Sequence, residues 1–270
     1  MKIIVSYGGG TNSTAMLIGL KERGVTPDAI TFADTGGEKP YTYEHINQVN
    51  NWCISSGFPE ITILKGSMPQ QIIDGTLENE CLRLGTLPSK AYGYSSCADK
   101  WKMNPQRKYD KEFANINGIP LRGIMRMIGF DADEHSRVAR GLELADRKPV
   151  NESYPLYEWG WGREDCIEAI SRAGLKQPGK SACFFCPSSK KPEILELQKL
   201  YPDLLSRAIE IERKALAGEG RAQATTGKGL GRSFNWGAFL LDVGVSKLDI
   251  NTAKLSDAGI PEMDCGCYDG

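Results

Sequence analysis

The stretch KIIVSYGGGTNSTAML, residues 2–17, determines how the rest of this chain is organised. A short β-branched apolar run is followed by three glycines, a polar cluster and a helical pattern that ends at Gly24. Glycines let a backbone approach a ligand closely, and the N–H groups and dipole at a helix N-terminus attract anions. The pattern therefore predicts a strand, a phosphate-binding glycine loop and a helix. A glycine-rich turn that binds nothing is the alternative.

Strand and helix patterns continue beyond this segment. Apolar runs at residues 29–34 and 61–64 predict two further strands, separated by a helical pattern. Alternating strands and helices are typical of an α/β fold with a doubly wound, mostly parallel sheet. Farther along, we expect a helical pair over residues 190–217. The chain is therefore expected to form an α/β nucleotide-binding domain at residues 1–150 and a helical, cysteine-containing C-terminal extension at residues 151–270.

The composition limits the partners of the chain. Among its 270 residues, 33 lysines and arginines nearly balance 34 aspartates and glutamates, so no global basic field recruits nucleic acid. No apolar run is long enough to cross a membrane, and no signal-peptide pattern opens the chain. We therefore expect a cytoplasmic protein without a membrane partner, and we expect it to form a homo-oligomer. Eight cysteines without an export signal favour metal or redox chemistry over disulfides.

The glycine segment GGGTNS, residues 8–13, resembles the PP-loop, Ser-Gly-Gly-x-Asp-Ser, of ATP pyrophosphatases and their sulfonucleotide-reductase relatives. Gly8 stands where the family has Ser, and Asn12 stands where it has Asp. The string FADTGGE, residues 32–38, looks like the second-strand signature of the PAPS reductase-like branch of this superfamily. A segment that begins at Gly129 is similar to the Gly-Ile-Arg-x-x-Glu-Ser-x-Arg segment of the same branch, with Asp131 in place of the family's Arg.

The resemblance implies that ATP, or else PAPS or adenylylsulfate, binds with Mg²⁺ at the carboxyl ends of the strands. The cofactor-binding residues that it implies are Ser6, Gly8, Gly9, Gly10, Thr11, Asn12, Ser13, Asp34, Thr35, Gly36, Glu38, Gly129, Glu134 and Arg137. Arg137 could pair with a phosphate through its planar guanidinium group, or it could form a salt bridge with Glu134 at helical spacing. Both interpretations stay open.

The cysteines fall into recognisable segments. Cys183 and Cys186 form a Cys-x2-Cys pair, which can hold one metal from a single turn. The segment around Cys97 is similar to the paired-cysteine segment of adenylylsulfate reductases, but Ser96 replaces the first cysteine. The tail Asp264-Cys265-Gly266-Cys267 is similar to the Glu-Cys-Gly-x-His tail that carries the reactive thiol of sulfonucleotide reductases.

These matches imply a catalytic nucleophile at Cys265. They also imply a [4Fe–4S] cluster held by Cys97, Cys183, Cys186 and Cys267. The reverse assignment of the two tail cysteines stays open. A tetrahedral Zn²⁺ site is the rival, built from Cys183, Cys186, Cys265 and Cys267. Three cysteines within apolar helical patterns are interpreted as small buried side chains: Cys53, Cys81 and Cys166.

Three functions are compatible with these patterns. The first is an ATP-dependent enzyme of sulfur chemistry that adenylates a nucleic-acid or small-molecule acceptor, releases pyrophosphate and transfers sulfur. The second is a PAPS or adenylylsulfate reductase, in which a tail thiolate attacks sulfur and a thioredoxin-like reductant releases sulfite. The third is a non-catalytic nucleotide-binding protein, in which Asn12 marks a degraded site.

Overall fold

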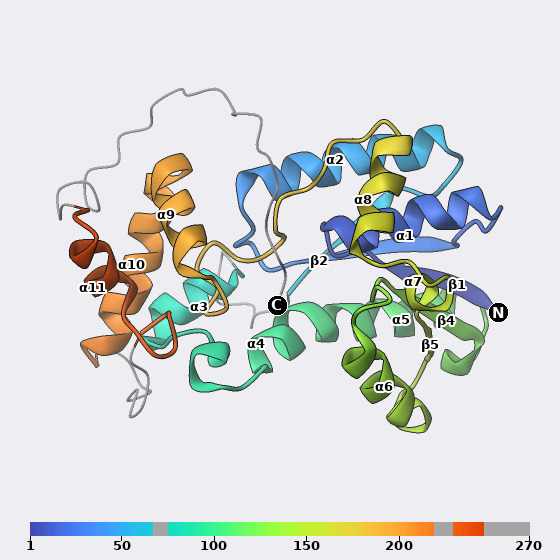
Figure 1. Ribbon diagram of the computed structural model, residues 1–270. Helices are drawn as coiled ribbons and strands as arrows, with labels where there is room; N and C mark the ends of the chain where they lie inside the picture. Colours follow the sequence, from blue (N-terminus) through green and yellow to red (C-terminus); the bar gives the residue numbers. More distant parts are fainter. Residues whose placement is uncertain (67–74, 219–228, 246–270) are drawn as a thin grey trace.

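The computed structural model describes residues 1–66, 75–218 and 229–245 of the chain. Figure 1 shows a sheet covered by helices and, beside it, a second group of helices. The tail that contains Cys265 and Cys267 lies outside the described residues, so the roles expected of these two cysteines stay predictions.

Within the described ranges, five parallel strands form one sheet in the order β3-β2-β1-β4-β5. Their bounds are β1 (Lys2–Ser6), β2 (Ala29–Asp34), β3 (Ile61–Lys65), β4 (Ile124–Ile128) and β5 (Asn151–Ser153). The central strand β1 pairs with β2, where Ile4 lies opposite Ala29, and with β4, where Ser6 lies opposite Ile128. The predicted α/β fold is confirmed, and the strands predicted after the first helix are β2 and β3.

Each face of the sheet has its own helices because successive side chains of a strand point to opposite faces. Val5 and Ile30 belong to one apolar cluster, which α1, α2 and α8 complete. Ile4 and Ala29 belong to another cluster, with side chains of α5. The bounds of these helices are α1 (Thr11–Glu22), α2 (Pro40–Ser55), α5 (Asn104–Ile116) and α8 (Arg163–Arg172). Because both faces are covered, the sheet is doubly wound, as predicted (Figure 1).

A third apolar cluster holds together the group of helices beside the sheet. Its helices are α3 (Leu77–Leu84), α9 (Lys191–Leu200), α10 (Pro202–Leu216) and α11 (Trp236–Asp242), and Phe184 and Phe185 pack among them. The predicted helical pair is confirmed as α9 and α10. Pro202 separates them because it occupies the first position of α10, where a proline needs no N–H partner.

The packing of the helices does not follow the expected division of the chain at residue 150. The helices α7 (Pro155–Glu158) and α8 return to the sheet, where Leu156 and Ile170 pack with α1. The much earlier helix α3 packs instead against α10. Each of the two larger cores is therefore assembled from segments on both sides of residue 150.

The other described elements are α4 (Ser96–Ala98), α6 (His135–Glu143), the 3₁₀ turns η1 (Ser89–Tyr92), η3 (Leu121–Gly123) and η4 (Ala145–Arg147), and the π-helical turn η2 (Asp99–Met103). Among the helices of residues 1–66, 75–218 and 229–245, none is long and apolar enough to cross a membrane.

Candidate functional site

The glycine loop, Gly8–Gly10, joins the end of β1 to the start of α1. Gly9 has a φ of +76°, which side-chain-bearing residues rarely adopt. A Cβ at this position would lie 3.2 Å from Thr42 Cγ2 and 3.4 Å from the ring of Phe32. The backbone conformation therefore favours glycine at position 9, and a side chain there would be tightly packed.

The start of α1 offers hydrogen-bond donors to an anion. Its first turn consists of the uncharged residues Thr11, Asn12 and Ser13, whose N–H groups have no intrahelical acceptor in a regular helix. The first intrahelical bond is donated by the backbone N–H of Thr14 to the carbonyl of Gly10, at 3.1 Å. No acidic side chain of this turn opposes the positive end of the helix dipole. The loop and helix therefore have the properties of the predicted phosphate site.

The helix α1 begins next to the end of β4. In the sheet, β1 lies between β2 and β4. This is the point where the strand order reverses, and ligands of open α/β sheets bind at such a point. A Cβ on Gly129 would lie 3.1 Å from the backbone N of Ser13, so a glycine is needed for β4 and α1 to approach so closely. Gly129 thus shapes the site through its lack of a side chain.

An acidic pair lies beside the glycine loop. The side-chain amide of Asn12 donates to Asp131 Oδ2 at 2.9 Å and to Glu134 Oε2 at 3.2 Å. Burial raises the pKa of Asp131 above its ordinary value, and the Asn12 hydrogen bond opposes that rise. Asp131 was not among the predicted site residues, although it lies just after β4, at the edge of the sheet where ligands bind in such folds. The two carboxylates can hold a cation close to phosphates on the loop.

Arg137 forms the predicted salt bridge with Glu134. Its guanidinium carbon also lies 4.2 Å from the centroid of the Phe130 ring, and its side chain is 61 % exposed. Of the two interpretations of Arg137, the structure shows the salt bridge with Glu134.

Two predicted site residues, Ser6 and Asp34, form hydrogen bonds with protein groups at the ends of β1 and β2. Ser6 donates to Gln106 Oε1 at 2.8 Å and accepts from Arg126 Nη1 at 2.7 Å. Asp34 Oδ1 accepts from the backbone N of Gly36 and from the hydroxyl of Tyr43, both at 2.8 Å. These contacts explain why polar residues stand here without requiring a ligand.

A later segment of the chain lies across the glycine loop. The hydroxyl of Ser181 donates to the carbonyl of Gly8 at 2.6 Å, and the hydroxyl of Tyr41 donates to the carbonyl of Lys180 at 2.9 Å. The ammonium of Lys180 is itself paired with Glu193 at 2.9 Å. The sequence did not single out Ser181, because its approach to Gly8 depends on the tertiary fold.

The remaining predicted residues, after β2, face the cysteines. Thr35 Oγ1 lies 3.1 Å from Cys183 Sγ, and Glu38 forms an antiparallel bridge with Cys183. Gly36 has a φ of +71°, and a Cβ there would collide with Thr76. Glu38 Oε1 accepts from Lys102 at 3.1 Å, while its buried Oε2 has no hydrogen-bond partner in the described part of the chain. The loop after β2, residues 35–39 and called the β2 loop below, therefore lies against Cys183.

Three of the predicted metal ligands are described, and all three lie in or against the apolar cluster beside the sheet: Cys97, Cys183 and Cys186. Burial raises the pKa of the Cys183 thiol to about 12; Glu38 adds to this rise and Lys102 opposes it. No three histidine, cysteine or acidic side chains within the described ranges already stand together as ligands of a metal ion. The donor set of several thiols nevertheless suits a thiophilic metal.

The three cysteines predicted to be small buried side chains are all buried, as predicted. Cys53 and Cys166 are fully buried in the cluster of the sheet, α1, α2 and α8. Burial raises the pKa of each thiol to about 12. Cys81 is also buried, but it lies in the cluster that contains the predicted metal ligands.

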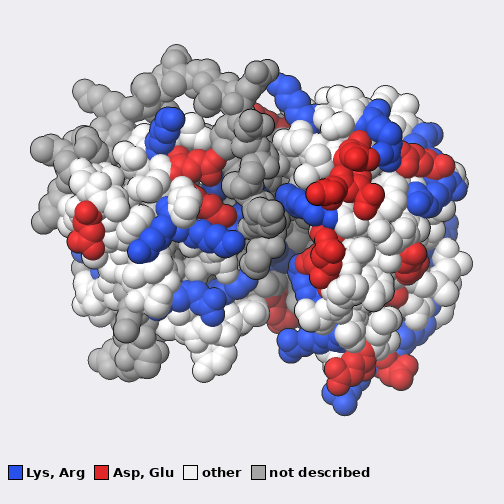
Figure 2. Space-filling view, in the orientation of Figure 1, with Lys and Arg blue, Asp and Glu red and all other residues white. Residues whose placement is uncertain are grey.

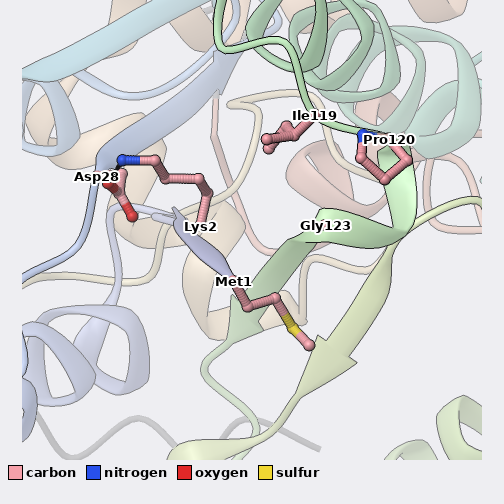
Figure 3. A pocket seen from close by; sticks show the side chains of 6 residues that line it. All are labelled: Met1, Lys2, Asp28, Ile119, Pro120 and Gly123. Atoms are coloured by element: carbon pink, nitrogen blue, oxygen red, sulfur yellow. Dashed lines mark hydrogen bonds and ion pairs between the residues drawn. The ribbon is translucent and has the colours of Figure 1, made fainter.

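A pocket of about 350 Å³ lies at the other end of β1, away from the glycine loop (Figure 3). Its walls include Ile119, Pro120 and Gly123, and its charged residues Lys2 and Asp28 are paired with each other at 2.7 Å. Since these two charges already satisfy one another, the pocket offers a ligand little specific recognition. We assign it no role.

The distribution of charged side chains on the surface does not indicate a particular partner. Figure 2 shows acidic and basic side chains intermixed over the described parts of one face. This agrees with the near balance of charges in the sequence. A nucleic-acid contact would have to rely on local groups rather than on a large basic area.

Comparison with known proteins gives a distant structural likeness. No protein-family model and no curated protein match the chain. Among solved structures, a similar fold occurs in the U34-tRNA thiolase NcsA from Methanococcus maripaludis with its [4Fe–4S] cluster. The two chains are 17 % identical with a TM-score of 0.43, and the match covers 82 % of this chain and 73 % of that one. A likeness at this level does not decide the chemistry of the site.

Proposed function

We propose that this chain is an ATP-dependent enzyme of sulfur chemistry, in the PAPS reductase-like branch of the PP-loop superfamily. The observation that carries the proposal is the glycine loop at the N-terminus of α1, where glycine at position 9 is favoured by its φ of +76° and by the tight space around it. Its place at the reversal of the strand order supports nucleotide binding.

In this proposal, the terminal phosphates of ATP lie on the glycine loop and accept hydrogen bonds from the N–H groups of Thr11, Asn12 and Ser13. Asp131 and Glu134, which Asn12 holds at the edge of the loop, would hold Mg²⁺, and the ion would offset the negative charge of the phosphates. An oxygen of the acceptor attacks the α-phosphorus, and the bond to the bridging oxygen of pyrophosphate breaks. The loop N–H groups stabilise the charge on the departing pyrophosphate.

The adenylated acceptor is then open to sulfur transfer. With sulfide as the donor, the sulfide attacks the activated carbon, a carbon–sulfur bond forms and AMP leaves with the acceptor oxygen. With a persulfide as the donor, the same attack leaves the acceptor joined to the carrier cysteine by a disulfide. A dithiol reductant then breaks that disulfide, releases the thiolated acceptor and is itself oxidised to a disulfide. Cys265 is the proposed carrier of the sulfur. A metal centre on the cysteines, with the predicted ligands Cys97, Cys183, Cys186 and Cys267, would bind and present that sulfur. We propose a nucleic acid or a small molecule as the acceptor, and a homo-oligomer as the working form.

The test is to supply ATP, Mg²⁺, a sulfide donor and candidate acceptors, and to measure AMP, pyrophosphate and the sulfur content of the acceptor. The proposal expects AMP and pyrophosphate in equal amounts, dependent on the acceptor. Release of ADP and phosphate would contradict it. So would ATP binding without pyrophosphate release for every acceptor, and that result would favour a non-catalytic nucleotide-binding protein.

A second candidate function is supported by the 3.1 Å contact between Thr35 and Cys183, which joins the β2 loop to the thiols. In a PAPS or adenylylsulfate reductase, the Cys265 thiolate would attack the sulfur of the nucleotide and release the nucleoside phosphate. A thioredoxin-like dithiol would then reduce the enzyme-bound thiosulfonate, releasing sulfite and becoming a disulfide. Sulfite production that survives Cys265→Ser would rule out this mechanism.

A further inference from the structure

A buried polar network lies beneath the glycine loop. The hydroxyl of Thr14, in α1, donates to the carbonyl of Gly10 at 2.9 Å. The same hydroxyl oxygen lies 3.0 Å from His45 Nε2 and 3.3 Å from the hydroxyl of Tyr7. Thr14 has no exposed surface, and Tyr7 and His45 are 2 % and 4 % exposed. The polar groups of these three side chains therefore depend on one another for hydrogen bonds.

His45 reaches this network from the buried face of α2. The buried residues of α2 recur at the spacing of one helical face: Thr42, His45, Ile46, Val49 and Cys53. The last three belong to the apolar cluster of the sheet, α1, α2 and α8. A helix face that packs into such a cluster does not need an imidazole. The contact with Thr14 explains why a histidine stands here.

The hydrogen bonds determine where the protons of the network lie. A carbonyl oxygen can only accept, so the single proton of the Thr14 hydroxyl goes to Gly10. The hydroxyl oxygen then accepts from His45 Nε2–H and from the phenol of Tyr7. Burial raises the pKa of Tyr7 and lowers the pKa of His45 to about 4, so both groups are neutral at pH 7. The neutral imidazole of His45 therefore carries its proton on Nε2.

The network holds one peptide of the anion site in place. The carbonyl of Gly10 also accepts from the backbone N–H of Thr14 and from the hydroxyl of Ser13, both at 3.1 Å. The peptide between Gly10 and Thr11 is planar and trans, so its N–H points away from this carbonyl. That N–H is one of those at the start of α1 without an intrahelical acceptor. Holding the carbonyl therefore leaves the N–H of Thr11 directed out of the helix.

We propose that His45 is a positioning residue of the glycine loop: it donates from Nε2 to the Thr14 hydroxyl, which keeps the Thr11 N–H directed at a phosphate group of the ligand. His45 touches no phosphate itself and acts through Thr14. An imidazole with its proton on Nδ1 would instead compete with Gly10 for the proton of the Thr14 hydroxyl. The inference rests on the proposed function, because it assigns phosphate binding to the glycine loop.

The test measures the affinity of the full chain for ATP and for inorganic pyrophosphate, with Mg²⁺ at pH 7, by calorimetric titration. His45→Leu removes the Nε2 donor and is expected to weaken both ligands roughly 5-fold, the effect of about one hydrogen bond. Thr14→Val removes the hydroxyl and keeps the shape of the side chain, and a similar loss is expected. His45→Gln places an amide donor near the position of Nε2 and is expected to restore most of the affinity.

Two controls separate positioning from a general loss of stability. Val49→Ala removes a buried apolar side chain from the same face of α2, so it should lower stability in urea unfolding and keep the affinity for both ligands. The double variant His45→Leu with Thr14→Val should lose no more affinity than either single variant, because His45 acts through Thr14. Additive losses would overturn the inference, as would a loss of affinity in Val49→Ala equal to that in His45→Leu.

A second measurement needs no ligand. In ¹⁵N NMR spectra at pH 7, the proton of the His45 imidazole should lie on Nε2, and the signals that are absent from His45→Gln identify this residue. A proton on Nδ1 would overturn the inference. If His45→Leu fails to fold, this spectrum and the affinity of Thr14→Val still decide the question.

The outcomes distinguish this inference from the proposed function. Equal affinities of the wild type and His45→Leu, with pyrophosphate release from ATP intact, would overturn the inference and leave the proposed function standing. Affinities in the expected order without any pyrophosphate release would support the inference and contradict the proposed function. A wild type that binds neither ATP nor pyrophosphate would contradict both.

Discussion

Asn12 and Asp131 are joined by a 2.9 Å hydrogen bond between the start of α1 and the end of β4. In the family pattern that this chain resembles, these two positions carry Asp and Arg. Here the carboxylate stands after β4, and the uncharged partner stands in the first turn of α1. The structure therefore retains a carboxylate beside the glycine loop, although the loop itself has lost one.

Exchanging the two side chains tests this relationship. Asn12→Asp alone should lower the free energy of unfolding by about 1–3 kcal/mol at pH 7, because it removes two hydrogen bonds to carboxylates and adds a like charge. The double variant Asn12→Asp with Asp131→Asn restores a donor opposite an acceptor and should recover most of this loss. Urea unfolding of the four proteins in the cycle measures the coupling. Equal stabilities of the double variant and Asn12→Asp would refute the pairing.

Gly9→Ala should weaken ATP binding because the new Cβ would displace the loop from Thr42 and Phe32. We expect a loss of roughly 100-fold in affinity, about 2.7 kcal/mol, by calorimetric titration. Gly57→Ala is the matched control: Gly57 has the same φ of +76°, but no atom lies within 4 Å of its added Cβ. It should lose about 1–2 kcal/mol of folding stability and keep its ATP affinity. Equal ATP affinities of the two variants would count against a phosphate site on this loop.

Local signals in the sequence were sufficient for the sheet and the glycine loop. The β-branched run before Gly8 forms β1, and the glycines lead directly into α1. Both elements were predicted from these neighbouring residues. Pro202 likewise marks the separation of α9 and α10 from its own backbone chemistry. These features could be predicted because the interactions that cause them are local.

Contacts between distant segments could not be predicted in this way. The apolar pattern around Cys81 is typical of a buried helix face, and only the fold shows that it shares an apolar cluster with Cys183, against which Cys97 packs. Ser181 reaches Gly8 because the segment before α9 returns across the loop. Asp131 was not predicted as a site residue because the family pattern has an arginine at this position, and its approach to Asn12 depends on the tertiary fold.

His45 should make the protein less stable in mild acid. Burial lowers its pKa to about 4, and its Nε2 lies 3.0 Å from Thr14 Oγ1, next to the glycine loop. The unfolded chain binds a proton near pH 6.5, which the folded chain binds only near pH 4, so stability falls as the pH drops through this window. The contribution amounts to up to about 3 kcal/mol. Urea unfolding from pH 7 to pH 5 should show a steeper loss for the wild type than for His45→Gln. Parallel pH profiles would contradict this assignment.

Breaking the buried ion pair between Arg126 and Asp110 should cost much more folding stability than breaking an exposed ion pair on α5, the helix that carries Asp110. Arg126 also donates to Ser6 Oγ at 2.7 Å, so the pair supports the strand that leads into the glycine loop. Asp110→Asn leaves the arginine charge buried without its counter-charge, and we expect a loss of about 3–5 kcal/mol in the free energy of unfolding. Lys108→Ala removes an exposed pair with Glu112 at 3.9 Å and should change stability by no more than about 0.5 kcal/mol. Comparable losses in the two variants would show that Asp110 does not compensate the buried charge of Arg126.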